Sequence, residues 1–299
     1  MRWGRLYFAV QAVAGAGWWV GVFTIPFVRS MTLGSLDPVL VAAFDIPLFV
    51  VASAIAALGL KPAAWAATGW TTLVAILLAV YATVSTEAGC GVLIMAAAAG
   101  ASILALCLLL LGRIPTELLT AGPFAFRQAR PSSNHVANTF GQLVLFWGLF
   151  LAVAPGVIVF LENRWQLSIQ FPSFVNWIGL GVLVLASGLG VWSAITMSVI
   201  GRGTPLPSAM ANSLVIAGPY RFVRNPMAVA GIVQGVAVGL LLSSWLVVVY
   251  ALIGSILWNY AVRPLEERDL EERFGEQFRA YRGRVRCWVP RLATKENHG

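Results

Sequence analysis

Long apolar segments recur along this chain and limit what it can fold into more than any other feature. A helix needs roughly 20 apolar residues to cross a bilayer, and the chain offers such segments at residues 6–28, 38–60, 63–85, 90–112, 139–161 and 174–200. Hydrophobic residues make up 59% of the sequence and charged residues only 11%, far from the balance of a soluble domain. The sequence therefore predicts an all-α, polytopic integral membrane protein.

A further apolar segment, residues 226–262, is too long for one crossing and carries Ser243 and Ser244 near its middle. We interpret it as a C-terminal hairpin of two spans, so that we expect about eight transmembrane helices. The charged segment that follows, residues 263–291, has apolar residues at helical spacing, which predicts a cytoplasmic helical tail with one apolar face. These residues are Leu270, Phe274, Phe278 and Tyr281.

The basic residues are distributed unevenly between the loops. Lys and Arg accumulate on the cytoplasmic side of membrane proteins, and with both termini inside, only Arg29 and Arg164 of the 20 basic residues fall on the other side. The net charge of +8 therefore reflects arginines that flank apolar helices and meet anionic headgroups. We expect the membrane as a partner, no nucleic acid, and cytoplasmic N- and C-termini. The oligomeric state stays open.

Several classes of site are not supported by the sequence. It has no phosphate-binding loop, dinucleotide fingerprint or zinc-protease motif, and His135 and His298 are the only histidines. Cys90, Cys107 and Cys287 lie in different segments, which indicates neither a disulfide framework nor a metal site. We expect no bound metal.

A polar cluster at residues 218–227 stands between two apolar segments. Pro226 suits the first turn of a helix, and Asn225 before it can cap free backbone amides. The cluster is equally well explained as a capped helix with arginines at a cytoplasmic boundary or as a site for an anionic or dipolar ligand. Glu266 and Glu267 lie beyond the hairpin, whose second arm returns to the level at which the first began. We therefore expect opposite charges to face each other across a cytoplasmic pocket.

A set of motifs occurs in order within about residues 174–292. They are Gly203-Thr204-Pro205, Leu214-Val215, Gly218-Pro219-Tyr220, Val223-Arg224-Asn225-Pro226-Met227, Glu266-Glu267 with Leu270, Phe274-Gly275, Tyr281 and Val289-Pro290-Arg291. This set resembles the isoprenylcysteine carboxyl methyltransferase family and its bacterial phospholipid-methyltransferase-like relatives. The resemblance implies a membrane enzyme, in a bacterial inner (plasma) membrane, that uses S-adenosylmethionine without a Rossmann domain. Its substrate would be a lipophilic small molecule or lipid, of the isoprenoid carboxylate or lipid headgroup type.

The resemblance also implies a division of the chain and a set of site residues. Residues 1–162 would be a transmembrane region of unknown role, and residues 163–299 the methyltransferase-like region with its tail. Arg263 would face the substrate, although its spacing to the glutamates differs from the family pattern by one residue. The cofactor contacts would be Asn212, Ser213, Leu214, Val215, Tyr220, Arg224, Asn225, Pro226, Met227, Ala228, Glu266 and Glu267.

This chain departs from the family pattern at two positions, because Ala228 and Phe278 each stand where the family usually has a tyrosine. Asn225 replaces the histidine of the prenylcysteine enzymes but is normal among the bacterial relatives. The Ala228 change alters one wall of the expected pocket. Methyl transfer needs mainly alignment of a nucleophile and exclusion of water, and the sequence identifies no dedicated general base. Methylation on oxygen, nitrogen, sulfur or carbon therefore remains open.

Two other functions are compatible with parts of the pattern. An NADPH-dependent membrane reductase of isoprenoid or sterol-like lipids is one, because sterol-reductase-like proteins resemble this C-terminal arrangement. A transporter or non-catalytic scaffold is the other, since Asp45 lies within a predicted span and intramembrane acids are often functional. We favour a structural role for Asp45, in which it hydrogen-bonds a neighbouring helix while neutral or lies near enough to water, because no intramembrane basic partner is evident.

Overall fold

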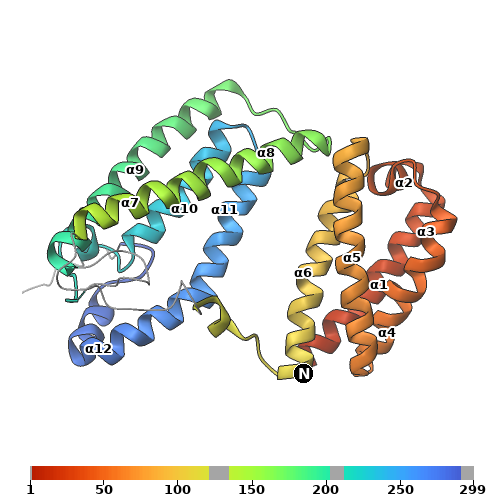
Figure 1. The fold of residues 1–299 in the computed structure, drawn as a ribbon, viewed down its shortest axis with the longest axis horizontal. Coiled ribbons are helices and arrows are strands. Elements are labelled where there is room, and N and C mark those ends of the chain that lie inside the picture. The colour runs from red at the N-terminus through yellow and green to blue at the C-terminus, as the bar shows by residue number, and fades with distance from the viewer. Residues whose placement is uncertain (1, 121–134, 203–211, 291–299) are drawn as a thin grey trace, which may run out of the picture. The chain divides into compact units, whose positions relative to one another are not determined.

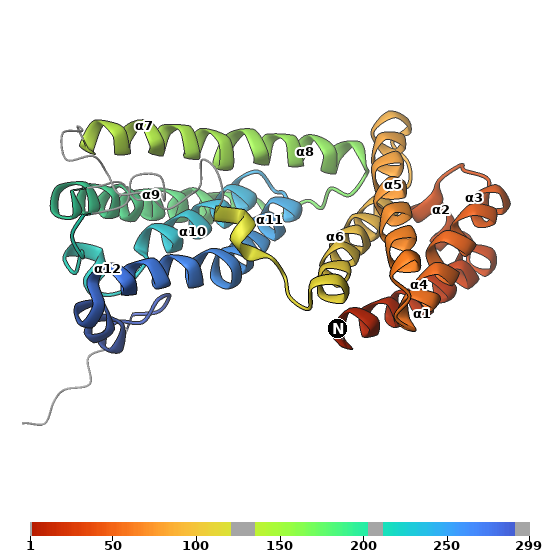
Figure 2. The same ribbon diagram turned by 60° about the horizontal axis from the view of Figure 1, so that its bottom comes forward.

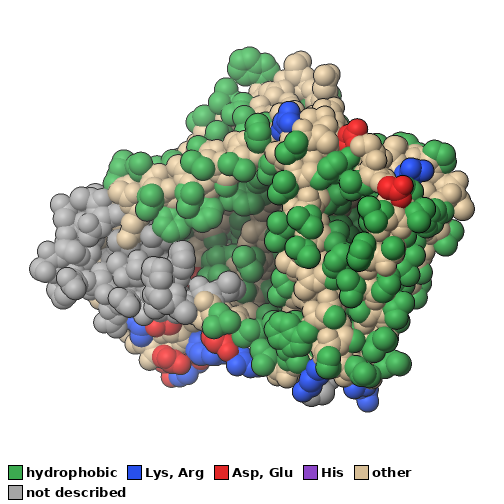
Figure 3. Space-filling view, turned by 45° about the vertical axis from the view of Figure 1, so that its right-hand side comes forward, with side chains coloured by type: hydrophobic (Ala, Val, Ile, Leu, Met, Phe, Trp, Pro, Cys, Tyr) green, Lys and Arg blue, Asp and Glu red, His purple; other side chains and the backbone are tan. Residues whose placement is uncertain are grey.

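The computed structural model describes residues 2–120, 135–202 and 212–290, which are helical apart from short connections and contain no strand (Figure 1). Seven helices in these ranges are long and apolar enough to cross a membrane. Figure 3 shows that apolar side chains cover much of the exposed helix surface, as a lipid-facing surface requires. The predicted all-α membrane architecture is therefore confirmed. The Gly203-Thr204-Pro205 motif and Arg291 lie outside the described residues.

The chain divides into two compact units, each with its own packing. The first comprises residues 1–115 and 160–168, and the second residues 116–159 and 169–299. Helix α8 (Ala154–Arg164) contains the boundary between them.

The first unit is built from six helices and a π-helical turn. These elements are α1 (Arg2–Thr24), α2 (Pro26–Leu33), α3 (Pro38–Asp45), the π-helix η1 (Ile46–Val51), α4 (Ala52–Ala57), α5 (Lys61–Ser85) and α6 (Gly89–Leu111). One face of α1 packs on α4 and α6, with Phe8 fully buried among alanines and leucines of these helices and of α5. Small residues allow close packing where lipid surrounds the helices.

The second unit contains the remaining elements. They are the 3-10 turn η2 (Thr116–Thr120), α7 (His135–Trp147), the π-helix η4 (Gly148–Val153), the first part of α8, α9 (Ser173–Gly201), the 3-10 turn η6 (Gly218–Arg221), α10 (Pro226–Leu241), α11 (Trp245–Leu257), the π-helix η7 (Trp258–Val262) and α12 (Arg263–Arg284). Figure 2 shows α7, η4 and α8 as one continuous helix. Helix α10 packs between α9 and α11.

Helices α10 and α11 form the predicted hairpin. Ser243 adopts a left-handed φ of 51°, and the Ser244 side chain accepts a hydrogen bond from the Val247 amide at 3.2 Å, which caps α11. A Cβ on Gly239 would lie 2.8 Å from the backbone nitrogen of Val248, so only glycine allows the two arms to approach this closely. Helix α10 has 16 residues, fewer than the roughly 20 of a full crossing. The expected count of eight spans is therefore not confirmed.

The tail helix differs from its prediction at one point. Gly275 has φ 50°, a left-handed conformation that breaks α12 within its length. Leu270 and Phe274 before the break therefore do not share a continuous helical face with Phe278 and Tyr281 after it, and the expected single apolar face is wrong. Phe278 and Tyr281 are buried, whereas Leu270 and Phe274 are half-buried.

Candidate functional site

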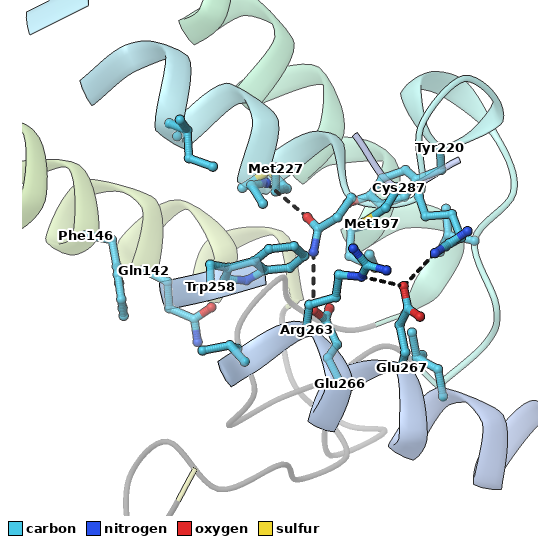
Figure 4. Close-up of a pocket in the computed structure, with 18 of the residues that line it drawn as sticks. Gln142, Phe146, Met197, Tyr220, Met227, Trp258, Arg263, Glu266, Glu267 and Cys287 are labelled. Atoms are coloured by element: carbon cyan, nitrogen blue, oxygen red, sulfur yellow. Dashed lines mark hydrogen bonds and ion pairs between the residues drawn. The ribbon is translucent and has the colours of Figure 1, made fainter. Parts of the chain in front are cut away.

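A cavity of about 480 Å³ lies wholly inside the second unit. Its lining residues come from α7, η4, α9, the Ser213–Val215 connection, η6, α10, α11, η7 and α12, and Cys287 adds one from the segment after α12. Figure 4 shows the charged residues at one end of this pocket and α7 at the other. The volume falls in the range of roughly 300–1,000 Å³ that small-molecule sites occupy.

The start of α10 and the start of α12 meet beside this cavity. The Asn225 Oδ1 atom accepts a hydrogen bond from the Ala228 amide at 3.0 Å and caps α10, as the sequence predicted. The Nδ2 atom of Asn225 donates to Glu266 Oε2 at 3.3 Å. The proline-led turn and the acidic pair, separated by some 40 residues of hairpin in the sequence, therefore lie side by side.

Arg224 connects three parts of the site. One guanidinium nitrogen lies 2.6 Å from Glu267 Oε1, and the other amino nitrogen donates to the Val285 carbonyl at 2.7 Å. Its backbone amide donates to the Arg286 carbonyl at 3.0 Å. Arg263 Nε also donates to Glu267 Oε1, at 3.1 Å. Glu267 is thus neutralised by two arginines, and Arg224 fastens the segment after α12 to the site.

Glu266 differs from its neighbour because no arginine pairs with it in the described parts of the chain. Among the described residues, its side chain accepts a hydrogen bond from the Asn225 amide. The apolar part of the last hairpin arm ends at Val262, and α12 begins with charged residues, so Glu266 lies beyond the membrane-spanning segment. Burial, with a further contribution from Glu267, raises the pKa of Glu266 to about 7. This carboxyl faces the pocket with its charge uncompensated.

Tyr220 supplies a further buried polar group to the pocket. Its side chain is 4% exposed, and its hydroxyl has no hydrogen-bond partner in the described structure. Its carbonyl accepts a hydrogen bond from the Tyr281 hydroxyl at 2.6 Å, which fixes η6 against α12. Burial raises the pKa of the Tyr220 phenol, so that it stays neutral and can donate or accept a hydrogen bond.

The structure brings together most of the residues that the sequence selected. Those that line the cavity are Ser213, Leu214, Val215, Tyr220, Arg224, Asn225, Met227, Ala228, Arg263, Glu266 and Glu267. Pro226 is buried at the helix start instead, and Asn212 is exposed with its amide donating to the Arg202 carbonyl at 2.8 Å. Ala228 and Phe278, which stand where the family usually has tyrosine, both line the cavity. Ala228 contributes a small side chain, and Phe278 is buried.

Sequence reasoning missed one wall of the pocket. Helix α7 and η4 contribute Thr139, Gln142, Leu143, Phe146, Trp147, Phe150 and Leu151. Nothing in the apolar pattern of this segment distinguishes a cavity wall from a lipid-facing surface. Gln142 is the one available signal, since a lone amide in a predicted span requires a polar partner. Trp258 and Cys287 also line the pocket and were not selected.

Asp45 belongs to the first unit, whereas the pocket residues belong to the second. Its carboxylate accepts hydrogen bonds from the indole nitrogens of Trp19, at 2.9 Å, and Trp70, at 2.8 Å. These tryptophans lie on α1 and α5, so Asp45 joins its own segment to two neighbouring helices. The structural role expected for this residue agrees with these contacts.

Comparison with known proteins adds one finding on the second unit. Residues 174–277 match the family model described as PEMT, phospholipid methyltransferase. No curated protein matches the chain. The matched segment contains α9, η6, α10, α11, η7 and most of α12, and therefore the capped helix start and both glutamates. Residues 174–277 are therefore similar to the phospholipid methyltransferases, a family of integral membrane methyltransferases.

Proposed function

We propose that the chain transfers a methyl group from S-adenosylmethionine to a hydrophobic acceptor embedded in the membrane. The observation that carries this proposal is Glu266, a carboxyl that lines the cavity without an ion pair in the described structure. A buried charge without a partner is unfavourable, which points to a cationic group in the ligand. The family match supports methyl transfer as the reaction class.

The residues of the pocket fit this cofactor chemically. S-adenosylmethionine carries an ammonium, a carboxylate, a sulfonium and an adenine, so its site needs an acidic group, hydrogen-bond donors and apolar surface. Glu266 would hold the ammonium, and the Tyr220 hydroxyl is free to bond a polar group of the ligand. The start of α10 favours a negative group such as the carboxylate. Leu214, Val215 and Met227 supply apolar surface between these groups.

The chain's own residues position the reactants and exclude water. When bound, the cofactor supplies an electrophilic methyl group on a sulfonium, which an acceptor atom can attack directly. Arg224 and Tyr281 hold α12 and the following segment against η6, and Cys287 lines the cavity there. Burial strengthens the attraction between Glu266 and a cation, because the local dielectric constant is lower than that of water.

The acceptor would occupy the part of the pocket that is lined by apolar side chains of α7, η4 and α10. Phe146, Trp147 and Phe150 form this surface. Arg263 lines the cavity between the apolar part and the acidic pair, a position suited to contact with an acceptor headgroup. Two of its nitrogens are already used, by Glu267 at 3.1 Å and by Asn259 Oδ1 at 2.7 Å.

Calorimetric titration of the purified full chain with S-adenosylmethionine tests this proposal. We expect binding, and an affinity about tenfold to hundredfold weaker for Glu266→Gln, since a charge-assisted bond is lost. Glu272→Gln is the matched control, because Glu272 is exposed on the same helix and does not line the cavity. No binding by the unaltered protein, or tighter binding of NADPH than of S-adenosylmethionine, would exclude the proposed cofactor.

A further inference from the structure

The α7 wall of the pocket lies outside the segment that matches the methyltransferase family. Its lining residues recur at spacings of one and three, from Thr139 to Leu151, and so share one face of the helix. All but Thr139 and Gln142 are apolar. Phe146 and Phe150 stack on this face with their ring centroids 5.5 Å apart. This face is suited to the hydrocarbon part of a lipid.

Gln142 interrupts that apolar face with a polar atom that has no partner. Its Oε1 atom is buried and accepts no hydrogen bond within the described structure. Figure 4 shows Gln142 and Phe146 extending from α7 on the side of the pocket opposite Tyr220 and Cys287. The other cavity glutamine, Gln234, differs because its amide donates to Ser187 Oγ at 3.0 Å. An unpaired buried carbonyl is unfavourable until a ligand supplies an N–H or O–H group.

The position of Gln142 indicates that the missing hydrogen-bond donor belongs to the methyl acceptor rather than to the cofactor. The residues proposed to hold the cofactor come from the Ser213–Ala228 segment and from the start of α12. Along its own helix, Gln142 is flanked by the apolar side chains of Leu143 and Phe146, which also line the cavity. A polar atom among such side chains meets the headgroup end of a lipid whose chain lies along the same wall.

We propose that Gln142 selects the acceptor by its headgroup, and that the acceptor carries an N–H or O–H donor at that end. This inference depends on the proposed function, because it names the second substrate of the same pocket. A carboxylate offers only acceptor atoms at neutral pH, and a fully substituted nitrogen or an ether offers no donor. Such headgroups leave the Gln142 carbonyl unpaired and bind more weakly.

Two probes of equal chain length isolate this contact. Dodecan-1-ol has an O–H donor, and dodecyl methyl ether has none. Binding of the tritiated probes to the full chain in detergent is measured with and without S-adenosylmethionine. We expect the unaltered protein to prefer the alcohol by roughly tenfold, the value of one hydrogen bond to a buried group. Gln142→Met keeps the shape but removes the carbonyl, and should reduce the preference to below about twofold. Gln142→Glu keeps an acceptor oxygen and should retain the preference.

Phe146→Leu is the matched control on the same face. It removes apolar contact and should weaken the binding of both probes equally, leaving their ratio unchanged. If Gln142→Met still prefers the alcohol over the ether, the inference is wrong. Loss of this preference in Gln142→Glu would also overturn it. The glutamate variant decides the question if Gln142→Met does not fold. A fall in S-adenosylmethionine affinity in Gln142→Met, with the probe ratio unchanged, would assign the carbonyl to the cofactor. The proposed function is tested separately. If the unaltered protein does not bind S-adenosylmethionine, that function is rejected, whereas the probe comparison made in the absence of S-adenosylmethionine still tests the role of Gln142.

Discussion

Buried polar groups are treated differently in the two units of this protein. In the first unit, Gln11 donates to Ser53 Oγ at 3.0 Å and accepts from Ser102 at 2.8 Å, and both oxygens of Asp45 accept from indoles. The Thr68 hydroxyl, buried without a hydrogen-bond partner in the described structure, is an exception in this unit. In the second unit, the pocket contains the Tyr220 hydroxyl and the Gln142 carbonyl without partners, and Glu266 without an ion pair, within the described residues.

This contrast separates polar groups used for folding from those held ready for a ligand. A satisfied interhelical hydrogen bond specifies which helices pack together, and in membranes it contributes roughly 0.6 kcal/mol on average. A group left without a partner reduces the stability of the ligand-free protein and regains that free energy on binding. Substitutions in the first unit should therefore alter stability, and substitutions in the pocket should alter affinity.

We expect replacement of Arg224 to have the largest effect, because this residue contributes both to the stability of the fold and to ligand binding in the pocket. Arg224→Met removes the ion pair with Glu267 and the bond to the Val285 carbonyl. We expect a loss of about 2–4 kcal/mol in unfolding free energy, since both ion-pair partners are largely buried, together with weaker S-adenosylmethionine binding. Chemical denaturation and calorimetry measure the two quantities. Arg279→Met is the control, because Arg279 is 53% exposed in its ion pair and should change stability by less than about 0.5 kcal/mol. Equal stability of the two variants would contradict the role given to Arg224.

Asp45 should affect stability alone. Asp45→Leu leaves the indole nitrogens of Trp19 and Trp70 without an acceptor, and we expect a loss of about 1–3 kcal/mol. S-adenosylmethionine affinity should stay within about twofold of the original value, because affinity depends on the other unit. Asp45→Asn retains one acceptor oxygen and should lose less stability. Abolished methyl transfer with unchanged unfolding would instead make Asp45 a functional residue and erase the contrast.

The pH dependence of binding gives the smallest expected effect. The pKa of Glu266 is raised to about 7 by burial, with Glu267 and Asp269 also disfavouring its charge, while Asn225 opposes the shift. The carboxyl must be ionised to pair with an ammonium, so affinity should rise about fivefold from pH 6 to pH 7. An α-ammonium stays charged over this interval, since its pKa is about 8.

Titrations at several pH values, with Glu266→Gln as the reference, measure this dependence. The variant should show a flat profile over the same interval, because its side chain does not ionise. The ligand-free protein should show the opposite trend in its stability. A folded-state pKa above the unfolded value of 4.5 means that stability is lost as the pH rises towards 7. An equally steep affinity profile in the variant would assign the pH dependence to another group.

The parts of this fold that follow from short-range rules were predictable from sequence. Apolar segments fixed the helices, and Asn225-Pro226 indicated the start of α10, because capping depends on adjacent residues. The meeting of Glu266 with Asn225 also followed, since two helical arms with the same rise return to the same level. The division into residues 1–162 and 163–299 stays a prediction.

Features that depend on tertiary packing were not predictable. The α7 wall was missed because a cavity-facing and a lipid-facing apolar helix have the same composition. The break at Gly275 was missed because glycine is compatible with helical and left-handed backbone alike, and the surrounding contacts decide between them. The two indole partners of Asp45 were likewise not identifiable, since tryptophans at span ends are commonly explained by the membrane interface.

The widened turn η7, Trp258–Val262, sets the direction in which the acidic pair points. Such a turn holds about one residue more than regular helix does, and each residue of an α-helix advances its azimuth by about 100°. Deleting a single position between Trp258 and Val262 would rotate Glu266 and Glu267 together away from Asn225, which caps α10, and from Arg224.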